Sequence, residues 1–291
     1  MSAKAHHFVP QFILRNFTDN CGHLHFWRRD KGVENIGMSS PRNLFQETHL
    51  YSSYSQDGRR DNRLEQFFAN KIEPDTATLF RRLLDEVRSG SVPELSAKDW
   101  ATWRSFWYFQ MKRSPGYMRS MADVTNVERY VDGQLAKAQA DNVIDATVAQ
   151  TLKPRMLQNI NVAAQAAGPS EKVQRRLAGL GIAIYYSSNA HKSFVVGDIP
   201  GASVSLKSAD GTTTFARFLP ISDDVALGLS DGPPSVTIVN VPPTVVRRMN
   251  EATLARSEVI AGRSKALVAS LARAATMQVS AALSPSGSGT K

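Results

Sequence analysis

The spacing of apolar residues changes along this chain, and the change constrains its fold more than any other feature. Between residues 61 and 113, apart from a break at 89–96, apolar side chains recur every three or four residues, as on one face of an α-helix. Between 182 and 241, short β-branched runs are separated by turn residues, which predicts a mostly antiparallel sheet. Residues 242–275 return to helical spacing as one long closing helix. An N-terminal hairpin or arm, a central helical block, a sheet and a long C-terminal helix predict the α+β class.

Particular residues refine the helical boundaries. Ser96 is expected to cap a helix over 97–113, because its hydroxyl can accept a first-turn N–H. Ser170 is expected to cap a short helix that stops near Gly179 or Gly181. Pro74 has no backbone N–H, so a kink or two abutting helices are expected there.

The first 52 residues are expected to be extended or irregular. Residues 23–27 alternate as a strand does, and the sequence GVENI is its expected hairpin partner across a turn at RDKG. Ser40 and Pro41 have the character of a helix start, with Ser40 as the cap.

The domain organisation is expected to be simple. The pattern predicts one α+β domain over residues 1–280, in which 118–168 forms a helical sub-domain or a lid. The sequence from 281 to 291, rich in Ser and Gly, is expected to be a disordered tail.

Charge and cysteine content limit the classes of function. The net charge is +9, and after residue 240 there are seven Lys and Arg against two Asp and Glu. Basic ends around a near-neutral middle suit a polyanion such as nucleic acid, or are simply a solvated surface. No apolar run is long enough to cross a membrane. The single cysteine, Cys21, excludes an internal disulfide, and the cytoplasm is the expected compartment.

The stretch AHHFVPQFILRNF places polar residues inside an apolar segment. His6 and His7 point apart in an extended backbone, so one is a candidate base or metal ligand and the other a structural residue. The alternative is that both bond to the backbone. If a helix starts at Pro10, Gln11 and Arg15 share a face, and Arg15 either clamps a phosphate or pairs with a buried carboxylate.

Carboxylates later in the chain are further candidates. Glu65 and Glu73 are eight residues apart, about 80° around an α-helix, and with a histidine they would suit Mg²⁺, Mn²⁺ or Zn²⁺. The alternative is that they pair with neighbouring arginines at the surface. Asp198 ends an apolar strand before a proline, a position typical of both a catalytic carboxylate and a backbone cap.

The end of the tryptophan-rich helix carries Gln110 and Arg113. Gln110 follows Trp107 by three residues, so it is expected to be half-buried and to need hydrogen-bond partners. Arg113 lies at the C-terminal end of this helix, where the helix dipole favours a cation whether or not the residue has a function.

These blocks, in this order, resemble a bacterial family known as domain of unknown function 4238. The resemblance begins at HHFVPQFILRNF and spans residues 5–265, with Gly197 standing where the family pattern has Ser. The family label implies no established activity. The later matching blocks are Asn43, Glu47 and Tyr51; Glu65 and Glu73; QMKRSP with Gln110 and Arg113; FVVGDIP with Asp198; FLPIS; and the Asn240 segment.

The leading hypothesis from the sequence is a hydrolase or nuclease-like enzyme acting on nucleic acid or a phosphorylated small molecule. The chain has no G-x-S-x-G elbow, P-loop or G-x-G-x-x-G. The alternative is a binding or interaction module, related to defence or toxicity, whose polar residues form a structural network. The assigned roles are catalysis for His6, His7, Glu65 and Asp198; substrate binding for Gln11, Arg15, Asn43, Gln110 and Arg113; and metal binding for Glu47 and Glu73.

Overall fold

The computed structural model describes residues 5–199, 201–207 and 213–283. The chain forms two compact units, each assembled from separate parts of the sequence. Unit 1 takes Met1–Pro10, Phe45–Leu83 and Glu94–Gly179, and unit 2 takes Gln11–Leu44, Leu84–Pro93 and Leu180–Lys291. The single domain expected over 1–280 stays a prediction, and each unit is described by itself.

Unit 1 is mainly helical, as the apolar spacing predicts. Its strands are short and lie in two antiparallel pairs, β1 with β4 and β5 with β6. Helix α3 begins in unit 1 and passes into unit 2 after Leu83. The elements are β1 (Ala5–His7), β4 (Gln46–Thr48), β5 (Ser53–Tyr54), β6 (Arg60–Asp61), α2 (Arg63–Phe67), the π-helix η3 (Phe68–Ile72), α3 (Glu73–Arg88), α4 (Ala97–Arg113), α5 (Pro115–Thr125), α6 (Val127–Ala140), α7 (Ala146–Ala166) and α8 (Glu171–Ala178).

Local capping residues set the helix starts. Ser96 Oγ accepts the Asp99 N–H while the Asp99 side chain accepts the Ser96 N–H, a complete capping box at the start of α4. Ser170 Oγ accepts the Val173 N–H at the start of α8, and Gly179 is the residue that ends it. The predicted caps at Ser96 and Ser170 are therefore confirmed.

The interruption expected at Pro74 is a π-helical turn. Residues 68–72 are π-helical between α2 and α3, directly before Glu73 and Pro74. A π turn takes more residues than an α turn, which changes the direction in which the following side chains point. The proline is the second residue of α3, which continues directly from η3.

The core of unit 1 is aromatic. Trp103 and Phe106 of α4 are buried against Phe80 of α3, with ring centroids 6.3 and 4.9 Å apart. Phe68 contacts Phe109 at 5.9 Å. The helical spacing of the aromatic residues in α4 therefore marks a packed face, as such a stripe usually does.

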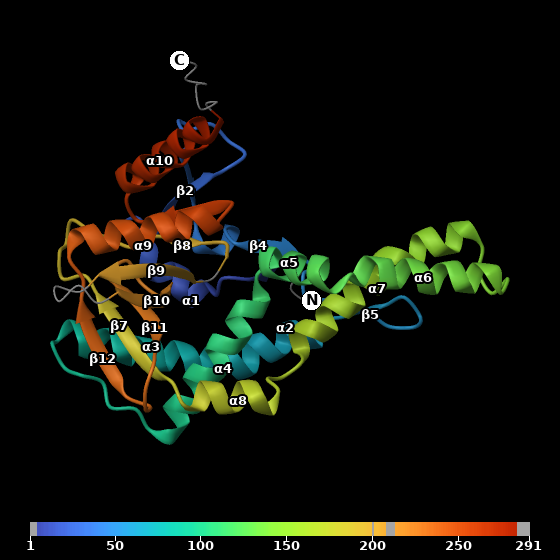
Figure 1. The fold of residues 1–291 in the computed structure, drawn as a ribbon, viewed down its shortest axis with the longest axis horizontal. Helices are drawn as coiled ribbons and strands as arrows, with labels where there is room; N and C mark the ends of the chain where they lie inside the picture. Colours follow the sequence, from blue (N-terminus) through green and yellow to red (C-terminus); the bar gives the residue numbers. More distant parts are fainter. Residues whose placement is uncertain (1–4, 200, 208–212, 284–291) are drawn as a thin grey trace, which may run out of the picture. The chain divides into compact units, whose positions relative to one another are not determined.

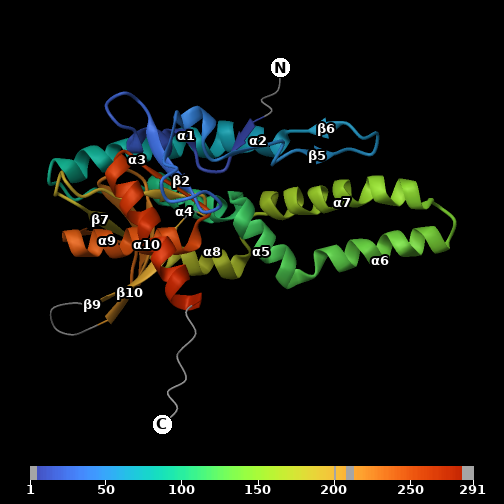
Figure 2. The same ribbon diagram turned by 90° about the horizontal axis from the view of Figure 1, so that it is seen from above.

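Helices α6 and α7 form an antiparallel hairpin (Figures 1 and 2), within the segment 118–168 that was expected to be helical. Val131, Leu135 and Ala149 are buried between them. The β5–β6 hairpin packs on α7, where Asn159 bonds both the N–H and the carbonyl oxygen of Tyr54 at 2.6 and 2.8 Å.

Unit 2 contains two sheets. The five-stranded sheet has the order β12-β7-β11-β10-β9, antiparallel except for the parallel β12–β7 pair, and the four-stranded sheet has the order β3-β2-β13-β8. Helix α9 lies along the five-stranded sheet and contacts β9 (Figure 1). The elements are α1 (Gln11–Leu14), η1 (Arg15–Phe17), β2 (Leu24–Arg28), β3 (Gly37–Ser39), η2 (Pro41–Asn43), β7 (Gly181–Tyr186), β8 (Val196–Gly197), β9 (Ala202–Lys207), β10 (Thr213–Pro220), β11 (Val225–Ser230), β12 (Val236–Asn240), α9 (Pro243–Arg256), β13 (Val259–Gly262) and α10 (Lys265–Leu283).

The helices and mostly antiparallel sheets confirm the α+β class, but three local predictions are wrong. The partner of β2 is β3, which follows the sequence GVENI rather than coinciding with it. Residues 41–43 form only one 3-10 turn, and the Ser40 side chain makes no capping bond. The closing segment is two helices, α9 and α10, because residues 259–262 between them pair with both β2 and β8.

The end of α10 bears on the predicted tail. The helix extends to Leu283, so residues 281–283 are helical, and the rest of the tail, 284–291, lies outside the described residues. Within the described part of the chain, no helix combines the length and apolar character needed to cross a bilayer.

Candidate functional site

His6 and His7 lie on strand β1 of unit 1, opposite Glu47 and Gln46 of β4. His6 is fully buried, and its Nδ1 accepts the Tyr51 N–H at 2.9 Å. Its ring also stacks on the Tyr51 ring at 5.6 Å. A nitrogen that accepts a backbone N–H is not available as a base, so His6 makes the backbone contact that was its alternative role.

Arg113 ends α4 and is the most deeply buried cation of this site, with 1% of its side chain exposed. Its Nη2 lies 2.7 Å from Glu73 Oε1 and donates to the His7 carbonyl oxygen, also at 2.7 Å. Its guanidinium carbon lies 4.6 Å from the centre of the Phe68 ring. Burial by itself lowers the pKa of Arg113, but the neighbouring Tyr51 and Glu73 raise it by more than burial lowers it. The pKa of Arg113 is therefore above its usual value. Arg113 is therefore a permanently charged residue held by a carboxylate, a carbonyl and an aromatic face.

Tyr51 joins the two residues just described, and no role was predicted for it from the sequence. Its hydroxyl donates to the Arg113 carbonyl oxygen at 3.1 Å and accepts from Arg113 Nε at 3.4 Å. Burial raises the pKa of Tyr51 despite the neighbouring Arg113, so its hydroxyl stays protonated. These contacts link residues 62 positions apart, so no local spacing could have revealed them.

Gln110 lies one turn before Arg113 on the same helix and is also buried. Its Nε2 donates to the Phe8 carbonyl oxygen at 2.8 Å, whereas its Oε1 is buried with no hydrogen-bond partner. Gln110 and Arg113 thus both hold the backbone of the N-terminal segment, at Phe8 and His7.

Glu65 is the residue of this site whose raised pKa lies near neutral pH. It is half-buried on α2, and its Oε2 is buried without a hydrogen-bond partner among the residues that the structure describes. Burial raises its pKa to about 7, with Arg113 opposing the increase and Glu73 adding to it. Continuous α-helix would place Glu65 and Glu73 about 80° apart. The π turn between them changes that angle, and both carboxylates interact with Arg113.

The other predicted site residues divide between the units. Glu47 is exposed on β4 in unit 1. Gln11, Arg15, Asn43 and Asp198 all belong to unit 2. Arg15 Nη2 bonds Gln11 Oε1 at 3.4 Å, so these two residues share a face as expected from their spacing.

Asp198 directly follows β8, and its hydrogen bonds attach it to the backbone where β13 begins. Its N–H donates to the Val259 carbonyl oxygen, and its Oδ1 accepts the Glu258 N–H, each at 3.0 Å. Burial raises the pKa of Asp198 even though these backbone bonds lower it. The contacts are those of a backbone cap, one of its two predicted roles.

The predicted metal ligands do not form a metal-binding group. Glu73 is bound to Arg113, and within the described residues no three His, Cys, Asp or Glu side chains are placed to hold an ion together. A divalent cation at Glu47, Glu73 and a histidine therefore stays a prediction.

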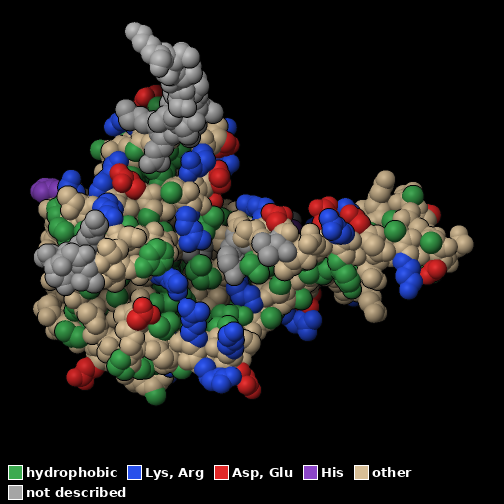
Figure 3. Space-filling model, in the orientation of Figure 1, with side chains coloured by type: hydrophobic (Ala, Val, Ile, Leu, Met, Phe, Trp, Pro, Cys, Tyr) green, Lys and Arg blue, Asp and Glu red, His purple; other side chains and the backbone are tan. Residues whose placement is uncertain are grey.

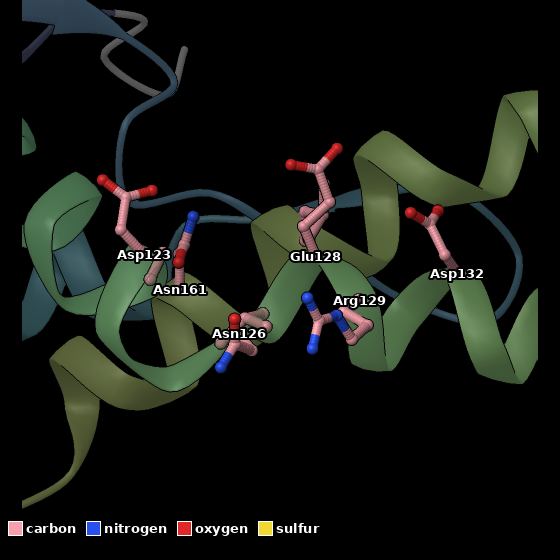
Figure 4. Close-up of a pocket in the computed structure, with 9 residues that line it drawn as sticks. Asp123, Asn126, Glu128, Arg129, Asp132 and Asn161 are labelled. Carbon is pink, nitrogen blue, oxygen red and sulfur yellow. The ribbon is translucent and has the colours of Figure 1, made fainter.

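A cavity of about 560 Å³ in unit 1, where α5, α6 and α7 meet, contains none of the predicted residues. Figure 4 shows the carboxylates of Asp123, Glu128 and Asp132 on one side of it. Lys153 already lies 2.9 and 2.7 Å from Glu128 and Asp132. Figure 3 likewise shows both signs of charge on the α6–α7 hairpin, rather than the uniform basic surface typical of a nucleic-acid groove.

The fold and the site together define an α+β protein whose N-terminal strand is held by a buried tyrosine, glutamine and arginine beside two glutamates. The chain belongs to the family described as Protein of unknown function (DUF4238), whose model matches residues 5–265. The resemblance noted in the sequence is thereby confirmed over the same span. Comparison with curated proteins and with solved structures gives no match.

Proposed function

We propose that this chain is a cytoplasmic bacterial hydrolase acting on nucleic acid or a phosphorylated small molecule, with Glu65 as its proton-transfer group. The observation that carries the proposal is the state of Glu65, a half-buried carboxyl with an unpartnered oxygen and a pKa of about 7. A group whose pKa lies near the working pH is well suited to general acid–base catalysis. The free thiol of Cys21 is consistent with a reducing compartment.

The neighbours of Glu65 support this role. In hydrolysis of a phosphate ester, the Glu65 carboxylate accepts a proton from water as the water oxygen bonds to phosphorus. The bond from phosphorus to the leaving oxygen then breaks, and that oxygen takes the proton back from the Glu65 carboxyl, which returns to the carboxylate. The Arg113 charge and the Glu73 charge act on the pKa of Glu65 in opposite directions, which keeps it within reach of neutral pH.

We narrow the predicted set of catalytic and substrate-binding residues accordingly. His6, Gln110 and Arg113 bind the protein itself, so we assign them to positioning the N-terminal strand. The same contacts favour the second candidate function, a non-catalytic binding module whose polar residues form a structural network. Glu65 distinguishes the hydrolase from the binding module. A buried carboxyl oxygen with no hydrogen-bond partner among the described residues adds no hydrogen bond to a structural network.

The test is hydrolysis of p-nitrophenyl phosphate, bis(p-nitrophenyl) phosphate and single-stranded DNA and RNA, each with Mn²⁺ or with a chelator. Glu65→Gln should abolish turnover without lowering thermal stability at pH 7. Glu171→Gln, at an exposed glutamate of unit 1, is the matched control and should keep full activity. His7→Ala and Asp198→Ala test the other predicted catalytic residues. Full activity in Glu65→Gln would overturn the assignment, and activity only with Mn²⁺ would restore the metal hypothesis.

A further inference from the structure

A second cavity, in unit 2, has the chemistry of an anion site. Its volume is about 360 Å³, and it lies between the first residues of α9, the first turn of α10 and the segment 191–193. All of its lining residues belong to unit 2, so nothing about it depends on the site around Glu65. We propose that this cavity binds a small molecule that carries a phosphate group.

The charged side chains that line the cavity are all basic. Lys192, Arg247 and the imidazole of His191 line it, and no Asp or Glu is among its lining residues. The Lys192 ammonium is exposed and makes no hydrogen bond or ion pair with any residue that the structure describes. An uncompensated lysine beside an arginine is the arrangement that attracts a phosphate.

Arg247 is held in place and still has donors to offer. Its Nε bonds Glu251 at 2.6 Å and its Nη1 donates to Ser270 Oγ at 2.9 Å. Its bonds to described residues run through Nε and Nη1, and its Nη2 makes no hydrogen bond with the described part of the chain, which leaves N–H groups for a ligand. The ion pair with Glu251 orients the guanidinium and offsets part of its charge, so Lys192 supplies the larger share of the attraction.

The wall of the cavity is fixed before any ligand arrives. Asn250 is buried on α9, where its Oδ1 accepts the Val195 N–H at 3.0 Å and its Nδ2 donates to the Ser193 carbonyl oxygen at 2.9 Å. These two bonds hold the chain next to Lys192 against the helix. Ser264 accepts the Leu267 N–H, and its own hydroxyl hydrogen is left to donate.

Size and apolar lining indicate a small ligand rather than a polymer. The volume lies near the lower end of the range for small-molecule pockets, which begins at roughly 300 Å³. Val246 and Leu267 give part of the lining an apolar character, suited to the organic part of a phosphate monoester.

Calorimetric titration at constant ionic strength tests the proposal, with AMP and inorganic phosphate as probes and adenosine as the probe without phosphate. AMP and phosphate should bind and adenosine should not. Lys192→Glu should weaken AMP binding by about tenfold or more, the loss expected for a charge-assisted contact. Arg273→Gln removes a positive charge from an exposed position on α10 outside the lining, and it should change binding by less than about twofold.

Several results would overturn the proposed phosphate site. These are no heat with either AMP or phosphate, equal binding of adenosine and AMP, or equal losses in Lys192→Glu and Arg273→Gln. Because Lys192 is exposed, its substitution should leave folding intact, and circular dichroism checks this. The Glu65→Gln protein should bind AMP as the wild type does, so failure of the proposed hydrolase and failure of this pocket are told apart.

Discussion

Arg113 and Glu73 form an ion pair in which the arginine side chain is 1% exposed and the glutamate 27% exposed, with 2.7 Å between Nη2 and Oε1. The cation is thus inside the protein while its partner still reaches the solvent. This asymmetry decides what happens when either residue is changed.

Glu73→Gln should lower the free energy of unfolding by about 3 kcal/mol, because it leaves a buried charge without its counter-ion. Urea unfolding measures the change. Lys98→Met is the matched control: it breaks an exposed pair with Asp75 at 3.3 Å and should cost less than about 1 kcal/mol. In the double variant Glu73→Gln/Arg113→Met, the loss should be smaller than the sum of the single losses. Equal effects of Glu73→Gln and Lys98→Met would contradict the role given to this pair.

His6→Ala should destabilise unit 1 by about 2 kcal/mol or more, because the buried Tyr51 N–H loses its acceptor and a cavity opens. His6→Asn should recover part of the loss, since its side-chain oxygen can replace Nδ1 as the acceptor. Thermal unfolding of the two variants checks this. Equal stability of the His6→Ala and His6→Asn proteins would show that the hydrogen bond to the Tyr51 N–H does not contribute to stability.

The raised pKa of Glu65 predicts a pH dependence of stability. The folded protein holds the Glu65 proton up to a pKa of about 7, against a usual value of 4.5, so this contribution to stability is complete below pH 4.5 and is lost as the pH rises through 7. The Glu65→Gln protein has no carboxyl at this position, so its stability does not fall in this way as the pH rises. It should match the wild type near pH 4 and exceed it at pH 8 by about 1–2 kcal/mol, a figure reduced because the carboxyl is partly exposed.

Urea unfolding of both proteins across this pH range isolates the contribution of Glu65 and its coupling to Glu73, because the carboxylates away from this site titrate in both proteins alike. A constant difference between the two proteins from pH 4 to pH 8 would show that the carboxyl has an ordinary pKa.

Gly197 lies where the structure leaves no room for a side chain. A Cβ at this position would overlap Ser257 Oγ and lie 3.1 Å from Thr253 Cγ2. Gly197→Ala should therefore cost about 1–3 kcal/mol. Adding Ser257→Ala should restore part of this, because it removes the overlapping oxygen, which has no hydrogen-bond partner where it is buried. Thermal unfolding of the single and double variants measures both effects, and a neutral Gly197→Ala would refute the steric argument.

The sequence was informative wherever structure depends on near neighbours. The Ser96 and Ser170 caps, the aromatic face of α4 and the shared face of Gln11 and Arg15 all involve residues within a turn or two of each other. The family resemblance is confirmed by the family match over residues 5–265.

What the sequence determined by itself is therefore the α+β class, most helices, their caps and the family. Tertiary structure alone decided that residues 259–262 pair as β13 instead of continuing a helix, because their partners in β2 and β8 come from distant parts of the chain. It also decided that Arg113 binds His7 and Glu73, which lie 106 and 40 positions away. Local propensity carries no information about such partners, and burial makes them compulsory, since a buried charge or N–H must be paired wherever the fold brings it.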